Sequence, residues 1–142
     1  MFVFNTKKNY FTLGDDGEHA TSFCLENGLI KKMRICPSCN DKMNMIKDKK
    51  AQNGFRCRCG FPCFKEIGLL KDSFFEESNL PLDKIIIFIF NWAYEECSFK
   101  KIKRDLEFAE HTYVDWKSFL REVCALKIFQ NNSKLGGPGI EV

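Results

Sequence analysis

The stretch GFRCRCGFPCFKE, residues 54–66, places Cys57, Cys59 and Cys63 within seven positions. Upstream, residues 36–39 read Cys-Pro-Ser-Cys, and seventeen residues lie between Cys39 and Cys57. Two residues between a pair of cysteines let the chain turn back, so that both thiolates reach one tetrahedral zinc ion. Two such clusters at this separation are typical of a zinc ribbon. The sequence therefore predicts a small β zinc ribbon over residues 33–66, with Asn53-Gly54 as a hairpin turn between the clusters.

The ligand set of this ribbon is ambiguous in its second half. Cys36 and Cys39 supply two ligands, and two more are needed from three cysteines with irregular spacing. We favour Cys57 with Cys63 and treat Cys59 as an alternate ligand or a free thiol. Cys59 with Cys63 stays open as a second choice, and so does a decayed ribbon with unliganded thiols. Four thiolates would make a closed, structural Zn²⁺ site with no position for a reacting water molecule.

The charge of the chain is concentrated on the predicted ribbon. The net charge is only +3 over 142 residues, but residues 31–65 carry ten Lys and Arg against two Asp, which gives +8. A basic segment of this kind indicates contact with a polyanion, although a solvated loop face is the simpler alternative. The residues that we expect to contact DNA phosphates here are Lys47, Lys49, Lys50, Arg56 and Arg58.

The composition favours a soluble, intracellular protein. The N-terminal residues lack the apolar region of a secretory signal, and the most apolar run, residues 85–93, is about half the length of a membrane span. In that compartment, eight cysteines indicate metal ligation or buried thiols rather than disulfides.

Helical patterns flank the ribbon on both sides. Asp15 or Asp16 is a candidate cap for a helix that runs to Leu25 and ends at Asn27-Gly28. Residues 80–83, Leu-Pro-Leu-Asp, indicate a helix start, and residues 85–96 follow. Their β-branched content would suit a strand, but their length and the lack of a pairing partner nearby favour a buried helix. Ser98 and Thr112 are candidate caps for two further helices. The second of these carries an apolar stripe of Trp116, Phe119, Leu120, Val123 and Cys124.

These patterns predict a mainly α fold with a small β zinc ribbon. The expected order is an N-terminal helical segment (1–32), the ribbon (33–66), a three-helix bundle resembling a helix-turn-helix (73–130) and a flexible stub (131–142). Cys97 and Cys124 are expected in the core of the bundle.

A helix, a break of about four residues and a second helix make a helix-turn-helix candidate. Polar residues near the start of the second helix would meet base edges in the major groove, although Asp115 disfavours this and a plain bundle is the alternative. The expected DNA contacts from this region are Lys100, Lys101, Lys103, Arg104, His111, Thr112, Tyr113, Lys117 and Arg121.

Several segments resemble, in order, the N-terminal part of Merlin-type DDE transposases and their bacterial insertion-sequence relatives. They are FRC (55–57), SFFEESNLPLDKIIIFIFNWA (73–93), HTYVDWKSFLREVC (111–124) and LGGPGIEV (135–142). The resemblance implies a zinc ribbon and a helix-turn-helix that hold transposon-end DNA. It also places a second-pair ligand at Cys63, which supports Cys57 with Cys63, whereas Cys59 departs from the pattern.

In that family, the catalytic domain, with three metal-binding acids, follows the last of these segments. The resemblance therefore implies a truncated transposase that recognises terminal repeats of double-stranded DNA and is not an enzyme. Self-association or pairing with a full-length transposase is a further expectation, with no membrane partner and with nuclear localisation in a eukaryotic host. The alternatives are a zinc-ribbon module for protein–protein contacts and a relic with no function.

Overall fold

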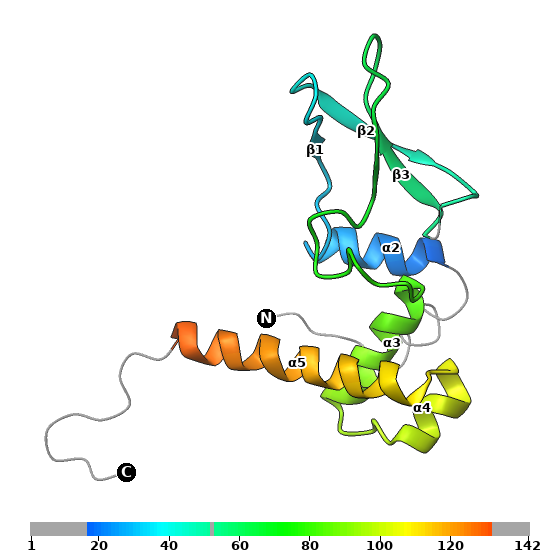
Figure 1. The fold of residues 1–142 in the computed structure, drawn as a ribbon, viewed down its shortest axis with the longest axis vertical. Coiled ribbons are helices and arrows are strands. Elements are labelled where there is room, and N and C mark those ends of the chain that lie inside the picture. The colour runs from blue at the N-terminus through cyan, green and yellow to red at the C-terminus, as the bar shows by residue number, and fades with distance from the viewer. Residues whose placement is uncertain (1–16, 52, 132–142) are drawn as a thin grey trace, which may run out of the picture. The chain divides into compact units, whose positions relative to one another are not determined.

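The computed structural model describes residues 17–51 and 53–131 (Figure 1), and the chain divides into two compact units, residues 1–87 and 88–142. Within the described residues, the fold is mixed α/β, with four helices and one four-stranded antiparallel sheet. The expectation of a mainly α protein was therefore too narrow, because the ribbon forms a sheet of four strands.

The sheet is a simple meander in which each strand pairs with the next one along the chain. The predicted β ribbon is confirmed, and its last strand ends beyond the predicted boundary at residue 66. The strands are β1 (Arg34–Ile35), β2 (Lys42–Lys47), β3 (Phe55–Arg58) and β4 (Glu66–Gly68).

The turn between β2 and β3 uses the predicted Asn53-Gly54 pair within a longer loop. Gly54 has φ +72°, a value that costs glycine little, and the N–H of Asp48 donates to its carbonyl at 2.8 Å. Asn53 is buried, and its carbonyl accepts from Thr21 Oγ1 at 3.5 Å while its side-chain oxygen accepts from the N–H of Leu82 at 3.4 Å. This turn is thus hydrogen-bonded both to the helix that precedes the sheet in the sequence and to the helix that follows it.

Helix α2 (Gly17–Glu26) confirms the helix predicted before the ribbon. It packs through Ala20 and Cys24, both fully buried. It ends at Glu26, and Gly28 just beyond it has φ +70°, which suits the glycine that commonly terminates a helix; the N–H of Leu29 donates to the carbonyl of Cys24 at 2.9 Å. The predicted caps, Asp15 and Asp16, lie outside the described residues.

Arg34 holds the segment that follows β4. Its guanidinium is buried and donates to the carbonyls of Leu69, at 2.8 Å, and Lys71, and to Asp72 Oδ2 at 3.4 Å. Asp72 has φ +54°, in the left-handed region that Asp tolerates better than most residues. Hydrogen bonds from a charged side chain therefore join β1 to residues 69–72, a segment in which Leu69 and Leu70 are buried.

Helix α3 (Leu82–Ala93) confirms the helical interpretation of the isoleucine-rich run. Leu82, Ile85 and Phe88 are fully buried, so burial on several sides outweighs the β-propensity of the sequence. The boundary between the two units falls between Ile87 and Phe88, inside this helix.

The second unit contains α4 (Phe99–Leu106) and α5 (Glu110–Asn131), joined by residues 107–109. Ser98 is the predicted N-cap, and its hydroxyl accepts from the N–H of Lys101 at 3.3 Å. The buried rings of Phe88 and Phe108 stack with their centroids 5.2 Å apart. None of the helices in the described part of the chain has the length and apolarity that crossing a bilayer requires.

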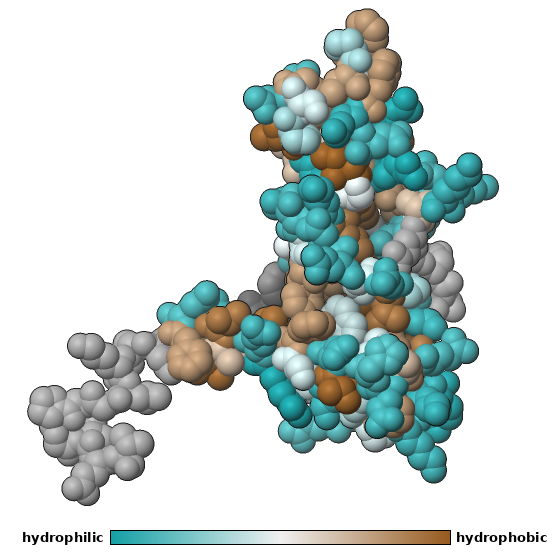
Figure 2. Space-filling model, viewed as in Figure 1, coloured by the Kyte–Doolittle hydropathy of each residue, from teal (hydrophilic) through white to brown (hydrophobic). Residues whose placement is uncertain are grey.

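The apolar stripe predicted for α5 is buried only in part. Trp116 and Leu120 are buried, whereas Phe119 and Val123 are about half exposed, at 49% and 46%. Cys124 is exposed, which corrects its expected place in the core. Figure 2 shows hydrophobic surface along the C-terminal part of α5, and among the described residues of this unit no helix of the same length accompanies it.

The role of Arg34 predicts a large cost for removing its charge. Arg34→Met should lower the free energy of unfolding of the first unit by about 3 kcal/mol, because two buried carbonyls lose their donor. Urea denaturation followed by circular dichroism measures this. The matched control, Lys32→Met, changes an exposed lysine and should stay within about 0.5 kcal/mol of the wild type. Equal effects of the two substitutions would contradict this role.

Candidate metal centre

Four cysteines converge at the end of the sheet. The sulfurs of Cys36, Cys39, Cys59 and Cys63 all lie within 4.8 Å of one another. Across the two turns, Sγ of Cys36 is 3.7 Å from Sγ of Cys63, and Sγ of Cys39 is 3.2 Å from Sγ of Cys59. Tetrahedral zinc with bonds of about 2.3 Å requires sulfurs about 3.8 Å apart. The cluster therefore has the size of a four-thiolate metal site.

The turn between β1 and β2 presents the first pair of sulfurs. The N–H of Cys36 donates to the carbonyl of Asp41 at 2.8 Å, and the N–H of Asn40 donates to the carbonyl of Cys36 at 2.9 Å. Asn40, directly after the second cysteine, has φ +59°, which reverses the chain. Asn is among the residues that adopt this conformation most readily.

The turn between β3 and β4 repeats this design with one more residue. The N–H of Cys59 donates to the carbonyl of Lys65 at 2.8 Å, and the N–H of Phe64 donates to the carbonyl of Gly60 at 3.1 Å. Phe64, again directly after the second cysteine, has φ +49°. The two turns thus present their sulfurs in a similar way, although two residues lie between the cysteines in one turn and three in the other.

This geometry corrects our preference for Cys57 as a ligand. Cys57 lies within the ladder, opposite Met45 on β2 and Ile67 on β4, and it is only 5% exposed. All four clustered cysteines instead come from the two turns, so the second choice, Cys59 with Cys63, is the arrangement found. The sequence carried a signal for it, since Gly60 and Pro62 mark residues 60–62 as a turn.

The sulfurs influence one another's protonation. The backbone N–H of Ser38 stabilises the thiolate of Cys36 and lowers the pKa of that thiol to about 6. At Cys39, the N–H of Asp41 favours the thiolate, but the hydrogen bond with Cys59 and burial outweigh it and raise the pKa to about 12. Cys36 thus ionises easily, whereas the raised pKa values of Cys39 and Cys59 show that these two thiols resist, as expected when several negative charges would share one site. A divalent cation would remove this conflict by binding all four thiolates.

The remaining buried thiols have surroundings unlike those of a ligand. Burial raises the pKa of Cys24 to about 12, and burial also raises the pKa of Cys97. Burial raises the pKa of Cys57 too, although the nearby guanidinium of Arg34 opposes the effect. These three thiols therefore stay protonated, as core residues do.

Most of the basic residues predicted on the ribbon have acidic partners. Lys47 Nζ lies 2.8 Å from Glu18 Oε2, while Arg56 pairs with Asp48 and, at 2.7 Å, with Glu66. Arg58 lies 3.7 Å from the same Glu66.

Lys49 and Lys50 are exposed in the turn between β2 and β3. Their ammonium groups have no ion-pair partner in the part of the chain that the structure describes. They are therefore the most accessible positive charges among the residues predicted on the ribbon.

The predicted contacts on α4 and α5 divide into two groups. Lys101 pairs with Glu96 at 2.6 Å and Arg104 with Asp105 at 2.7 Å. Tyr113 Oη donates to the carbonyl of Cys97 at 2.6 Å and accepts from Lys117 Nζ at 3.3 Å, so both of these side chains bind within their own unit. The other predicted contacts are at least partly exposed, namely Lys100, Lys103, His111, Thr112 and Arg121.

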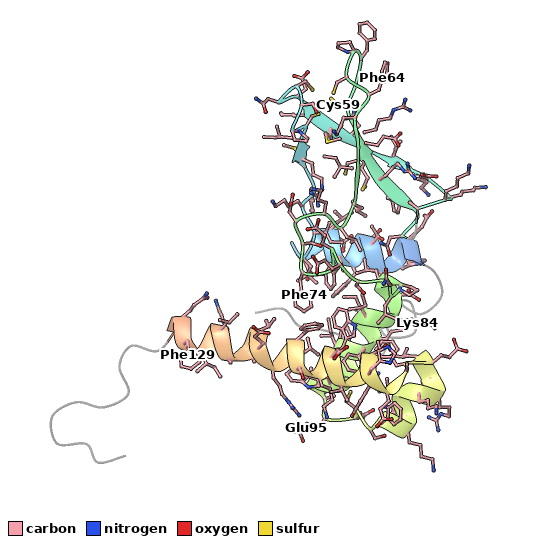
Figure 3. All side chains as sticks on the ribbon, viewed as in Figure 1. Cys59, Phe64, Phe74, Lys84, Glu95 and Phe129 are labelled. Carbon is pink, nitrogen blue, oxygen red and sulfur yellow. The ribbon has the colours of Figure 1, made fainter. Side chains whose placement is uncertain are left out.

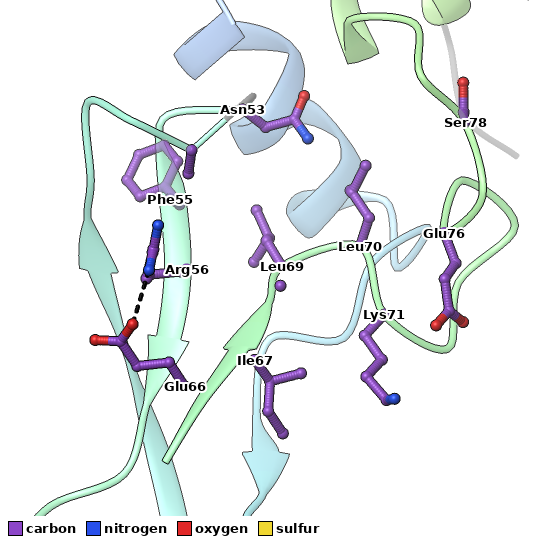
Figure 4. A pocket seen from close by; sticks show the side chains of 12 residues that line it. Asn53, Phe55, Arg56, Glu66, Ile67, Leu69, Leu70, Lys71, Glu76 and Ser78 are labelled. Carbon is purple, nitrogen blue, oxygen red and sulfur yellow. Dashed lines mark hydrogen bonds and ion pairs between the residues drawn. The ribbon is translucent and has the colours of Figure 1, made fainter. Parts of the chain in front are cut away.

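The first unit also contains a cavity of about 510 Å³ beside β3 and β4 (Figure 4). Its wall includes Arg56 and Glu66, whose charges neutralise each other across 2.7 Å, and Glu76, whose carboxylate accepts from the N–H of Asp72 at 2.8 Å. These polar groups are already engaged, so the cavity is a weaker candidate site than the cysteine cluster.

Comparison of the chain with protein-family profiles, with curated proteins and with solved structures found no match. The interpretation of the site therefore rests on its own geometry and chemistry.

Exchanging cysteines one at a time distinguishes the two ligand sets. Cys59→Ser should lose bound zinc, whereas Cys57→Ser should keep about one zinc per chain, because Cys57 lies outside the cluster. Elemental analysis of the purified variants measures the metal content. Zinc retained in Cys59→Ser and lost in Cys57→Ser would reverse the assignment.

Removing the metal should unfold the sheet while the second unit keeps its structure. That unit has a core of its own, which includes Phe88, Ile102 and Phe108, whereas the sheet buries few apolar side chains. On addition of EDTA, amide NMR signals of residues 34–68 should collapse and those of residues 99–131 should persist, with recovery on adding zinc. Unchanged signals from the sheet would contradict a structural metal.

Proposed function

We propose that this chain is a zinc-dependent DNA-binding module that recognises transposon-end DNA, as its resemblance to Merlin-type transposases implies. The observation that carries the proposal is a four-cysteine cluster at the end of a sheet drawn from the most basic part of the sequence. The proposed activity is binding, without catalysis.

Zinc is the metal that best fits the cluster. Tetrahedral sites with four thiolates select zinc or iron–sulfur centres, and four sulfurs that all lie within 4.8 Å of one another leave room for a single ion. Four protein ligands fill such a site, so the metal would have a structural role. A sheet of roughly 35 residues is too small to be stable by apolar burial alone and would depend on this ion.

Double-stranded DNA is the proposed partner because of the charge of residues 31–65, which is +8. Lys49 and Lys50 project without acidic partners among the described residues, and they would contact phosphates first. Arg56 and Arg58 are held by Glu66 in ion pairs that are partly exposed to solvent. Surface ion pairs contribute about 0–1 kcal/mol, so phosphate groups can compete for both arginines.

The second unit would read the bases. α4 and α5 are joined by three residues, a length typical of a helix-turn-helix. His111, Thr112 and Arg121 on α5 would face the major groove, whereas Tyr113 supports the helix from inside its unit.

A module for protein–protein contacts is the second candidate. It is favoured by the exposed apolar side chains of α5, among them Leu126, Ile128 and Phe129 at 55%, 58% and 77%. Contiguous apolar surface of this kind often marks a protein interface. Such an interface would depend little on salt, unlike a contact with phosphates.

Fluorescence anisotropy over a salt series tests the proposal. The zinc-loaded protein should bind a labelled duplex from the DNA flanking its gene more tightly than an unrelated duplex, and affinity should fall steeply with salt. The double variant Lys49→Gln/Lys50→Gln should weaken binding to both duplexes and lower the log–log salt slope by about 2.

The control for this experiment is Lys127→Gln, which removes an exposed charge from α5 and should change neither quantity. Weak binding that is equal on all duplexes would reject sequence-specific recognition. Association of the protein with itself that is insensitive to salt, with no DNA binding, would favour the interaction module.

A further inference from the structure

The turn between β3 and β4 exposes two aromatic rings that the metal site does not require. Phe61 is 85% exposed and Phe64 is 50% exposed, and their ring centroids lie 5.9 Å apart at an interplanar angle of 73°. Figure 3 shows Phe64 on the turn beyond Cys59, and Figure 2 shows hydrophobic surface at this end of the unit. We call these two rings the aromatic tip.

The other turn of the same site shows that the rings are not needed to hold a metal. Pro37 and Ser38 lie between its two cysteines, and Asn40 stands where the second turn has Phe64; all three are exposed. The two turns share their hydrogen-bond pattern, so the geometry of the cluster does not explain Phe61 and Phe64. Leaving two phenyl rings in water gives up the free energy of burying them, which makes a ligand the better explanation.

Positive charge surrounds the aromatic tip. The guanidinium of Arg58 lies over the ring of Phe64, 5.3 Å from its centroid, and Lys65 is exposed beside it. Glu66 lies 3.7 Å from Arg58 and is the acid that partly offsets this charge. Exposed ring faces with adjacent cations are the two elements of a surface that binds single-stranded nucleic acid.

We propose that the aromatic tip is a stacking site for unpaired bases of single-stranded nucleic acid. This inference rests on the proposed function, and it adds a contact at which opened bases, rather than duplex, are held. Bases inside a closed duplex are already stacked, so only unpaired bases can cover the faces of Phe61 and Phe64. Arg58 and Lys65 would hold the phosphates beside those bases.

The charge favours nucleic acid over a protein as the occupant. The buried centre of a protein interface is depleted of charged residues, whereas here Arg58 lies on the ring of Phe64 itself. A phosphodiester chain with stacked bases complements both parts of this surface. Phenylalanine offers no hydrogen bond, so the site should bind with little preference for base sequence.

Anisotropy with three labelled probes tests this. The probes are a twelve-nucleotide oligothymidylate, an abasic oligomer with the same number of phosphates and a twenty-base-pair duplex. The wild type should bind the oligothymidylate at least about tenfold more tightly than the abasic oligomer, because stacking adds to the phosphate contacts. Phe61→Ala/Phe64→Ala should abolish that difference and leave duplex affinity within about twofold.

Two controls test whether the effect is specific to Phe61 and Phe64 and whether their double variant remains folded. Phe129→Ala removes a ring that is also exposed, at 77%, from the other unit, and it should not change the preference for bases. Zinc content and circular dichroism of the Phe61→Ala/Phe64→Ala variant should match the wild type, because the rings are exposed.

Each of the remaining outcomes would contradict either the stacking site or the proposed function. If the wild type binds duplex but does not prefer oligothymidylate over the abasic oligomer, the stacking site is rejected and the proposed function stands. If it binds none of the probes, the proposed function fails as well. If the double variant instead loses self-association in sedimentation experiments and retains its preference for bases, the rings form a protein contact.

Discussion

The convergence of four sulfurs from two separate turns is the constraint on which the first unit depends. Each turn uses a positive-φ residue, Asn40 or Phe64, to bring its two cysteines to the same end of the sheet. The strands themselves bury few apolar groups, among which Met43 and Cys57 lie on β2 and β3. A metal shared by the four sulfurs would add the stability that so little burial within the strands does not supply, because ordering the loops costs conformational entropy.

A sheet held at one end by metal leaves its faces available for other uses. In a sheet stabilised by a core, alternate side chains would be needed for packing. Here β2 instead exposes Lys42, Asn44 and Met45, and the turns carry lysines and phenylalanines. Arg34 adds to this, since hydrogen bonds from one buried guanidinium join β1 to residues 69–72, where Leu69 and Leu70 are also buried. A small unit can in this way present a surface that is both basic and aromatic.

The sequence predicted most of what depends on local chemistry and missed what depends on register and on neighbours. The cap expected at Thr112 was wrong, because α5 begins at Glu110. The helix after Ser98, the glycine end of α2 and the helical state of residues 82–93 follow from caps, φ preferences and length, and all are confirmed. Cys57 was misassigned because spacing alone does not show where a strand ends and its turn begins. The stripe of α5 was read as core, but α4 is 8 residues long and α5 is 22, so α4 is too short to cover that stripe.

The basic ribbon segment and the apolar side of α5 differ in the chemistry of their exposed surfaces. Residues 31–65 carry a charge of +8, whereas α5 exposes Leu126, Ile128 and Phe129. Contacts of the first kind weaken as salt rises, whereas burial of apolar surface does not. The proposed DNA binding by the ribbon and self-association through α5 would therefore be compatible in one chain. Salt would separate them, because it weakens contacts with phosphates and leaves an apolar contact intact.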